Sequence, residues 1–304
     1  MTNVKVKAAR LSIISNTILI ALKVAVGIVT QSVSVLSEAV HSGIDLIASI
    51  IAYFSVREAG KPADEQHHFG HGKIENVSGT IEAVLIFGAG IYIIIEALQK
   101  LRSGHTAVGS LGLGAAVMAL SAIVNFIVSN RLLRIAKETD SIALEADALH
   151  LRTDVYTSAG VFGGLIAIHF TGYSVLDPII AMAVALLILK AAYDLTKSAF
   201  EHILDAKLPD HEEKVIQGIV HQYSHEYVEV HKMRTRKAGA ERHIDMHLVV
   251  PKGLAVESAH ALADKVVSAI KSKLSYSHVL VHIEPCNGGC DACRRPLDCK
   301  AVKA

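Results

Sequence analysis

The stretch VSVLSEAVHSGIDLIASIIAYFSV at residues 33–56 decides the fold of this chain. Its side chains are mostly apolar, and it exceeds the roughly 20 residues that an α-helix needs to cross a bilayer. Five other segments share this character, at about 10–29, 78–100, 109–131, 143–169 and 175–195. We therefore predict an α-helical membrane protein with six transmembrane helices.

The composition of the whole chain agrees with this prediction. The 304 residues are 51% hydrophobic and 19% charged, whereas soluble domains contain about 25% charged residues. The mean hydropathy is +0.40. These values exclude a disordered chain, a secreted disulfide-rich miniprotein and a purely cytosolic enzyme. A net charge of +1 without a basic stripe also argues against nucleic acid as a partner.

Lysine and arginine are distributed unevenly between the loops. Residues 1–10 and the loops 57–77 and 132–142 are basic, whereas the links 30–32 and 170–174 contain neither residue type. Cytoplasmic loops of membrane proteins carry an excess of lysine and arginine. We expect a multi-pass protein in the lipid of the cell (inner or plasma) membrane, with both termini in the cytoplasm.

The C-terminal third reads like a small soluble domain. Helical spacing occurs at 210–223 and 256–274, and alternating strand-like runs occur at 227–236, 242–250 and 278–283. We predict a cytoplasmic α+β domain from these elements. The expected division is a six-helix transmembrane domain at 1–205, the α+β domain at 206–285 and a cysteine-containing tail at 286–304.

Two His-x-x-x-Asp pairs lie inside the predicted transmembrane helices, His41 with Asp45 and His150 with Asp154. Residues four apart share one helix face, and an ionisable side chain in a span costs about 2.5–3.5 kcal/mol by insertion scales. Two imidazoles and two carboxylates form a nitrogen and oxygen set that suits tetrahedral zinc. A single pair is more typical of a hydrogen bond within one helix. Two matched pairs predict a metal site.

Four acidic residues in the spans give weaker signals, because each lies near a helix end or lacks a spaced partner: Glu38, Glu82, Glu96 and Asp147. Glu82 and Asp147 could line an access route, but solvation at the membrane interface is the simpler interpretation. Lys23 and Lys190 are expected to extend their ammonium groups toward the interface.

The loop after the second predicted helix contains Asp64, His67 and His71. These side chains could close on one ion because neighbouring glycines permit a tight turn. A solvated polar loop is the alternative.

Nine of the 17 histidines lie in the C-terminal third. On the second predicted strand, His243 and His247 share one face. His231 on the preceding strand, and His282 and Glu284 on the last, could meet that face. Singly each histidine is more typical of a surface position, but together they predict a cytoplasmic metal site.

All four cysteines lie in the tail, at Cys286, Cys290, Cys293 and Cys299. Clustered thiols on an intracellular segment favour metal binding over disulfides. A redox-sensitive or simply flexible tail is the alternative.

The chain resembles the cation diffusion facilitator family over nearly its whole length. The resemblance rests on the six helices, the two His-x-x-x-Asp pairs, the loop PADEQHHFGHGK at 62–73 and the histidine-bearing domain. It implies a homodimer with membrane domains spread like a V and a metallochaperone-like cytoplasmic domain. His41 stands where some bacterial relatives have Asp, and the resulting set resembles the zinc-preferring branch of the family.

The resemblance also implies roles for individual residues. The transport site would comprise His41, Asp45, His150 and Asp154. The loop site would comprise Asp64, His67 and His71. The dimer-interface site would comprise His231, His247, His260, His282 and Glu284. Lys73 and Asp205 would form a salt bridge between the membrane and cytoplasmic parts.

These features together predict a proton-coupled antiporter that exports divalent cations from the cytoplasm. Zn²⁺ is the first candidate, both as cargo and as a regulatory ligand, with protons as the exchanged substrate. Export of Fe²⁺, Cd²⁺ or Co²⁺ and a non-transporting membrane metal sensor are the alternatives. The sequence contains no His-Glu-x-x-His motif, so we do not expect a metalloenzyme.

Overall fold

The computed structural model describes residues 2–30, 33–103, 113–171, 173 and 175–286. It divides into two compact units between Ile203 and Leu204.

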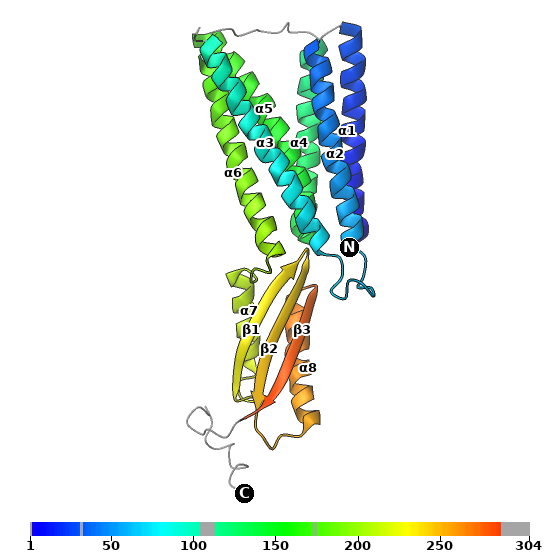
Figure 1. Ribbon diagram of the computed structural model, residues 1–304, viewed down its shortest axis with the longest axis vertical. Coiled ribbons are helices and arrows are strands. Elements are labelled where there is room, and N and C mark those ends of the chain that lie inside the picture. The colour runs from blue at the N-terminus through cyan, green and yellow to red at the C-terminus, as the bar shows by residue number, and fades with distance from the viewer. Residues whose placement is uncertain (1, 31–32, 104–112, 172, 174, 287–304) are drawn as a thin grey trace. The chain divides into compact units, whose positions relative to one another are not determined.

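The described part of the first unit consists of six long helices (Figure 1): α1 (Thr2–Thr30), α2 (Val33–Ala59), α3 (Lys73–Ser103), α4 (Leu113–Thr139), α5 (Ile142–Thr171) and α6 (Leu176–Ile203). The described residues include five helices that are long and apolar enough to cross a membrane by length and composition. The first half of α5 carries ionisable residues, among them Asp147, His150 and Asp154. The predicted helical membrane domain is confirmed.

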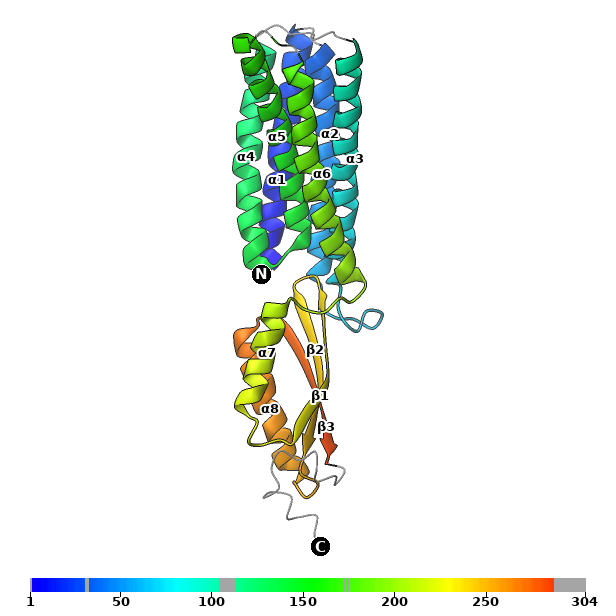
Figure 2. The same cartoon turned by 90° about the vertical axis from the view of Figure 1, so that its left-hand side faces the viewer.

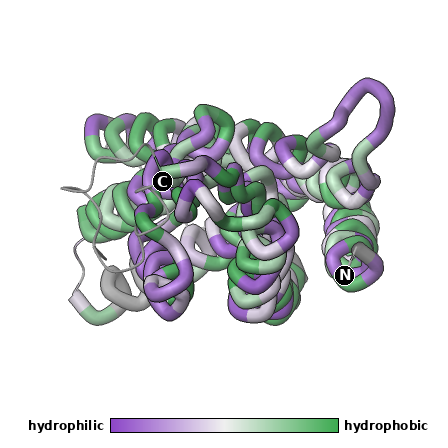
Figure 3. The backbone as a smooth tube through the Cα atoms, turned by 90° about the horizontal axis from the view of Figure 1, so that it is seen from below, coloured by the Kyte–Doolittle hydropathy of each residue, from purple (hydrophilic) through white to green (hydrophobic). Residues whose placement is uncertain are grey.

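Helix α5 lies at the centre of the bundle. It contacts each of the other helices, and Figure 1 shows it crossing from the end of α4 toward α3 and α6. Seen from below, Figure 3 shows hydrophilic colours along the loop that follows α2. Helix α5 therefore brings Asp147 and His150 into the interior of a bundle of apolar helices.

The second unit contains α7 (Asp210–Gln222), β1 (Glu229–Ala238), β2 (Glu241–Val250), α8 (Val256–Lys273) and β3 (Ser277–Pro285). Strand β2 is central, antiparallel to β1 and parallel to β3. Figure 2 shows α7 and α8 on the same side of the sheet. This arrangement confirms the predicted α+β domain.

The alternation along β2 separates a hydrophobic core from a polar face. Ile244, Met246 and Leu248 are buried in the core between sheet and helices. His243 and His247, which alternate with them, are only partly buried, because successive strand residues point to opposite faces. The histidines therefore lie on the side of the sheet that the helices leave open.

Candidate metal centres

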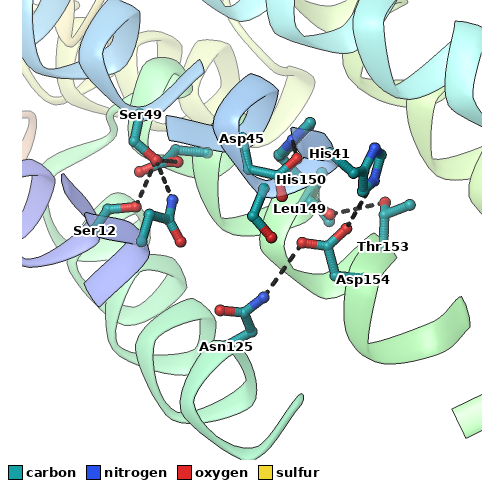
Figure 4. Close-up of polar contacts among 12 residues, drawn as sticks. Ser12, His41, Asp45, Ser49, Asn125, Leu149, His150, Thr153 and Asp154 are labelled. Carbon is teal, nitrogen blue, oxygen red and sulfur yellow. Dashed lines mark hydrogen bonds and ion pairs between the residues drawn. The ribbon is translucent and has the colours of Figure 1, made fainter. Parts of the chain in front are cut away.

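The four ionisable residues of the two His-x-x-x-Asp pairs meet between α2 and α5 (Figure 4). His150 Nε2 lies 2.9 Å from Asp45 Oδ1, and His41 Nε2 lies 4.0 Å from Asp154 Oδ1. Potential ligand atoms of His41, Asp45 and Asp154 all lie within 4.8 Å of one another. Each imidazole thus contacts the carboxylate of the other helix, which differs from a hydrogen bond within one helix.

The surroundings of this group are polar and partly enclosed. Asp45 and His150 are buried, whereas the His41 side chain is 52% exposed. On α4, Asn125 Nδ2 donates to Asp154 Oδ2 at 3.3 Å. A cavity of about 70 Å³ borders His41, Asp45 and Asp154. One edge of the group is therefore open to a small ion.

A chain of buried hydrogen bonds lies beside the group (Figure 4). Ser49 Oγ donates to Asp147 Oδ1 at 2.9 Å, and Asn16 Nδ2 donates to Ser49 Oγ at 2.9 Å. Asp147 and Glu82 are both 0% exposed. Interfacial solvation is therefore wrong for these two carboxyl groups, because packing between helices removes them from solvent.

The loop between α2 and α3 brings its three predicted residues together. Asp64 Oδ2 lies 3.4 Å from His71 Nε2, and its Oδ1 lies 3.3 Å from His67 Nδ1. The backbone N–H groups of His67 and Gln66 donate to Asp64, which lowers the pKa of this carboxyl. Gly70 has a φ of 75°, a conformation that glycine adopts at little cost. The loop thus presents one ionised carboxylate and two imidazoles in one turn.

On the sheet, three histidines occupy neighbouring positions of adjacent strands. His231 pairs with His247, and His247 pairs with His282. Glu284 reaches His247 Nδ1 at 2.6 Å and His231 Nε2 at 3.1 Å. The hydrogen bond with His247 lowers the pKa of Glu284. His282 lies at the edge of this group, with its Nε2 3.8 Å from Glu284.

Other predicted site residues lie outside these three groups. His260 is exposed on α8, with its Nε2 3.4 Å from Asp264. Cys286 is buried at the end of β3, where its N–H donates to Val250. The remaining tail cysteines lie outside the described residues: Cys290, Cys293 and Cys299.

The predicted salt bridge between Lys73 and Asp205 concerns one residue of each unit, and it stays a prediction. Within the first unit, Lys73 Nζ donates to the carbonyl of Ile203 at 3.3 Å. Within the second, Asp205 accepts a hydrogen bond from Arg236 at 3.2 Å.

Comparison with known proteins matches each of the two units to a domain of known family. Residues 9–204 match the model of the cation efflux transmembrane domain, and residues 208–286 match that of the cytoplasmic domain of cation efflux proteins. The chain belongs to the cation diffusion facilitator family. Members of this family are cation efflux transporters, so the first unit is a membrane domain and the second a cytoplasmic one.

Two of the relatives of this cation diffusion facilitator match most of its length. The cation-efflux pump FieF of Yersinia pestis (strain Pestoides F) is 32% identical over 284 residues, which are 93% of each chain. An uncharacterized transporter of Synechocystis, sll1263, is 34% identical over 87% of this chain and 85% of its own. A solved structure of the putative zinc transporter CzrB is 31% identical and covers 26% of this chain and 99% of its own, with a TM-score of 0.26.

Two residues beside the transmembrane group were not predicted as part of it. Asn125 carries no charge, so nothing in the sequence separated it from other polar residues of apolar helices. Lys23 was expected to reach toward the interface, and this is wrong. It is 5% exposed, and its Nζ donates to Ser42 Oγ at 2.7 Å. The position of Lys23 well inside an apolar span could have indicated its burial from the sequence.

Proposed function

We propose that this family member exports Zn²⁺ from the cytoplasm in exchange for protons, and that His41, Asp45, His150 and Asp154 bind the ion during transport. The observation that carries the proposal is the pairing of imidazoles and carboxylates across α2 and α5. A site shared by two helices can change its exposure when the helices move relative to one another. A site within one helix could not do so as readily.

The choice of zinc rests on the chemistry of the proposed ligands. Two imidazole nitrogens and two carboxylate oxygens suit tetrahedral Zn²⁺. The same donor types also bind Fe²⁺, Cd²⁺ and Co²⁺, because ligand type restricts a site without fixing its metal. These three ions are therefore the competitors in any transport experiment.

Proton exchange follows from the same ligands. Metal binding requires neutral imidazoles and ionised carboxylates, so binding releases protons and protonation expels the metal. Free imidazole has a pKa of about 6.5, which places the exchange in the physiological range. Alternating access would expose the four ligands to the cytoplasm and then to the opposite side.

The cytoplasmic domain has a proposed regulatory role. We assign the chain to a homodimer in the cell membrane, with both termini in the cytoplasm as its basic loops predict. Zn²⁺ bound by His231, His247 and Glu284 would favour one arrangement of the dimer and so couple transport to metal excess. His260 and His282 would complete this site, His260 by approach from the second copy of the chain.

Zinc flux into proteoliposomes tests the proposal. The double variant Asp45→Ala and Asp154→Ala should lose uptake, because both carboxylate ligands are removed. The control is Asp194→Ala, which removes an exposed carboxylate of α6, and it should transport like the wild type. Zinc uptake that survives in the double variant would refute the proposed site. A wild-type protein that binds zinc without moving it would instead indicate a metal sensor.

A further inference from the structure

Lys23 lies in the wall of the cavity that borders the proposed transport site. The same cavity is lined by His41, Asp45 and Asp154. Lys23 Nζ donates to Ser42 Oγ at 2.7 Å and lies 3.5 Å from Glu38 Oε2. Ser42 follows the proposed ligand His41 directly on α2. The ammonium group of Lys23 is thus hydrogen-bonded to α2, the helix that carries two of the four proposed ligands.

The burial of the Lys23 ammonium inside a predicted span carries a free-energy cost that needs an explanation. The Lys23 side chain is 7% exposed and that of Glu38 is 42% exposed, so the ammonium is the more enclosed member of the pair. An ionisable side chain inside a span is costly. A single hydrogen bond to Ser42 and a partly exposed counter-ion offset that cost only in part.

The cavity has a charge balance that matches one divalent ion. Its ionisable groups are Lys23, Glu38, Asp45 and Asp154, besides His41. With the carboxylates ionised and the imidazole neutral, the net charge is minus two. One divalent cation therefore neutralises the cavity while the ammonium remains in it. The ammonium repels that cation, because both charges lie in the same small cavity.

We propose that Lys23 is a tethered cation of the transport cavity that weakens metal binding and thereby promotes metal release. Glu38 restrains the ammonium and limits this repulsion. When the metal leaves, the ammonium can move toward the vacated carboxylates and hinder rebinding. Lys23 is a positioning residue in this account, since it contributes no ligand atom. The inference rests on the proposed function of the site.

The two members of the pair should have opposite effects on affinity. Lys23→Met keeps the length of the side chain and removes its charge, so zinc should bind more tightly, by about tenfold or more. Glu38→Gln releases the ammonium and removes a negative charge, so zinc should bind more weakly by a similar factor. A purely structural ion pair would instead make both variants weaker binders.

Calorimetry of zinc binding to the full-length protein in detergent provides the test. All proteins carry Asp64→Ala, His231→Ala and His247→Ala, and also Cys286→Ser, Cys290→Ser, Cys293→Ser and Cys299→Ser, so that the loop, cytoplasmic and tail groups do not contribute. The variants are Lys23→Met, Glu38→Gln, their combination, and Lys23→Arg as the control that keeps the charge. We expect Lys23→Met to bind zinc more tightly than the parent and Glu38→Gln to bind it more weakly. The combined variant and Lys23→Arg should both bind zinc about as tightly as the parent. Zinc release from Lys23→Met in stopped-flow measurements should slow by about the factor gained in affinity.

The possible outcomes separate the two proposals. If Asp45→Ala abolishes binding but Lys23→Met binds zinc no more tightly than the parent, the role of Lys23 is refuted and the transport site stands. Equal effects of Lys23→Met and Lys23→Arg would refute the role of charge. If the parent binds no zinc, or Asp45→Ala leaves binding unchanged, the proposed site fails and the inference fails with it. Thermal unfolding of each variant confirms that it is folded.

Discussion

Asp154 is held by a residue that is not itself a proposed ligand. Asn125 Nδ2 donates to Asp154 Oδ2 at 3.3 Å from α4. Groups that orient a ligand typically change metal affinity by about 10–100-fold when they are removed. The position of this carboxylate therefore depends on a third helix besides the two that carry the proposed ligands.

Replacement of Asn125 tests that dependence. Asn125→Ala should weaken zinc binding by about tenfold, because Asp154 loses the donor that fixes its orientation. The control is Ser129→Ala, one turn further along α4, where the hydroxyl donates only to the carbonyl of Phe126 in its own helix. Calorimetry in detergent measures both variants. Equal affinities for Asn125→Ala and Ser129→Ala would contradict the orienting role.

At the scale of elements, α3 and α6 pack closely at Gly90. A Cβ atom on Gly90 would lie 2.8 Å from Leu189 Cδ2 and 2.9 Å from Leu189 Cγ. A Cβ atom on Gly88, in the same helix, would meet nothing within 4 Å. The two glycines therefore form a matched pair for testing the contact.

Alanine at each position separates packing from helix propensity. Both substitutions gain the helix preference of alanine over glycine, about 1 kcal/mol. Only Gly90→Ala overpacks the α3–α6 contact, at a typical cost of about 1–3 kcal/mol. The melting temperature of Gly90→Ala in detergent should therefore fall below that of Gly88→Ala. Identical melting temperatures would show that the two helices are not packed this closely.

The sheet of the second unit contains a pH-dependent element. Burial, together with the nearby Arg236 guanidinium and His278, lowers the pKa of His243 from 6.5 to about 4. The unfolded chain therefore takes up a proton at this position at higher pH than the folded chain does. The contribution of His243 to the free energy of unfolding is therefore fully present above pH 6.5, and it is lost as the pH falls toward 4.

Hydrogen exchange of the β2 amides in the metal-free, full-length protein checks this dependence. After correction for intrinsic exchange rates, protection in the wild type should decrease between pH 7 and pH 5. His243→Gln should flatten that decrease, because glutamine does not titrate. The control is His211→Gln, which replaces an exposed histidine at the start of α7. If protection in His243→Gln decreases with falling pH as much as in the wild type, groups other than His243 cause the decrease.

The two units differ in how far the sequence predicted them, and the reason is physical. In the soluble domain, apolar residues such as Ile244 and Met246 alternate with polar ones, so the buried face could be predicted. In the membrane domain, lipid is as apolar as the interior of the bundle. Apolar patterning there predicts spans but not which face meets a neighbour. The burial of Lys23, Glu82 and Asp147 depends on those helix contacts, so the sequence did not predict it.

At the scale of the whole molecule, the four proposed transmembrane ligands could be picked out from the sequence because their spacing is local. Each pair needs only one helix turn to share a face. The pairing across α2 and α5 is a tertiary property, and it is the feature on which the exchange mechanism depends. In that mechanism, protons and zinc compete for the same four side chains.

Simultaneous recording of zinc uptake and lumenal pH in proteoliposomes tests this exchange most directly. Vesicles with an acidic lumen should take up zinc several-fold faster than vesicles without a pH gradient, and the lumen should become more alkaline as zinc enters. Asp45→Ala with Asp154→Ala should abolish both signals. Zinc uptake that is independent of the gradient and leaves the lumenal pH unchanged would contradict the account.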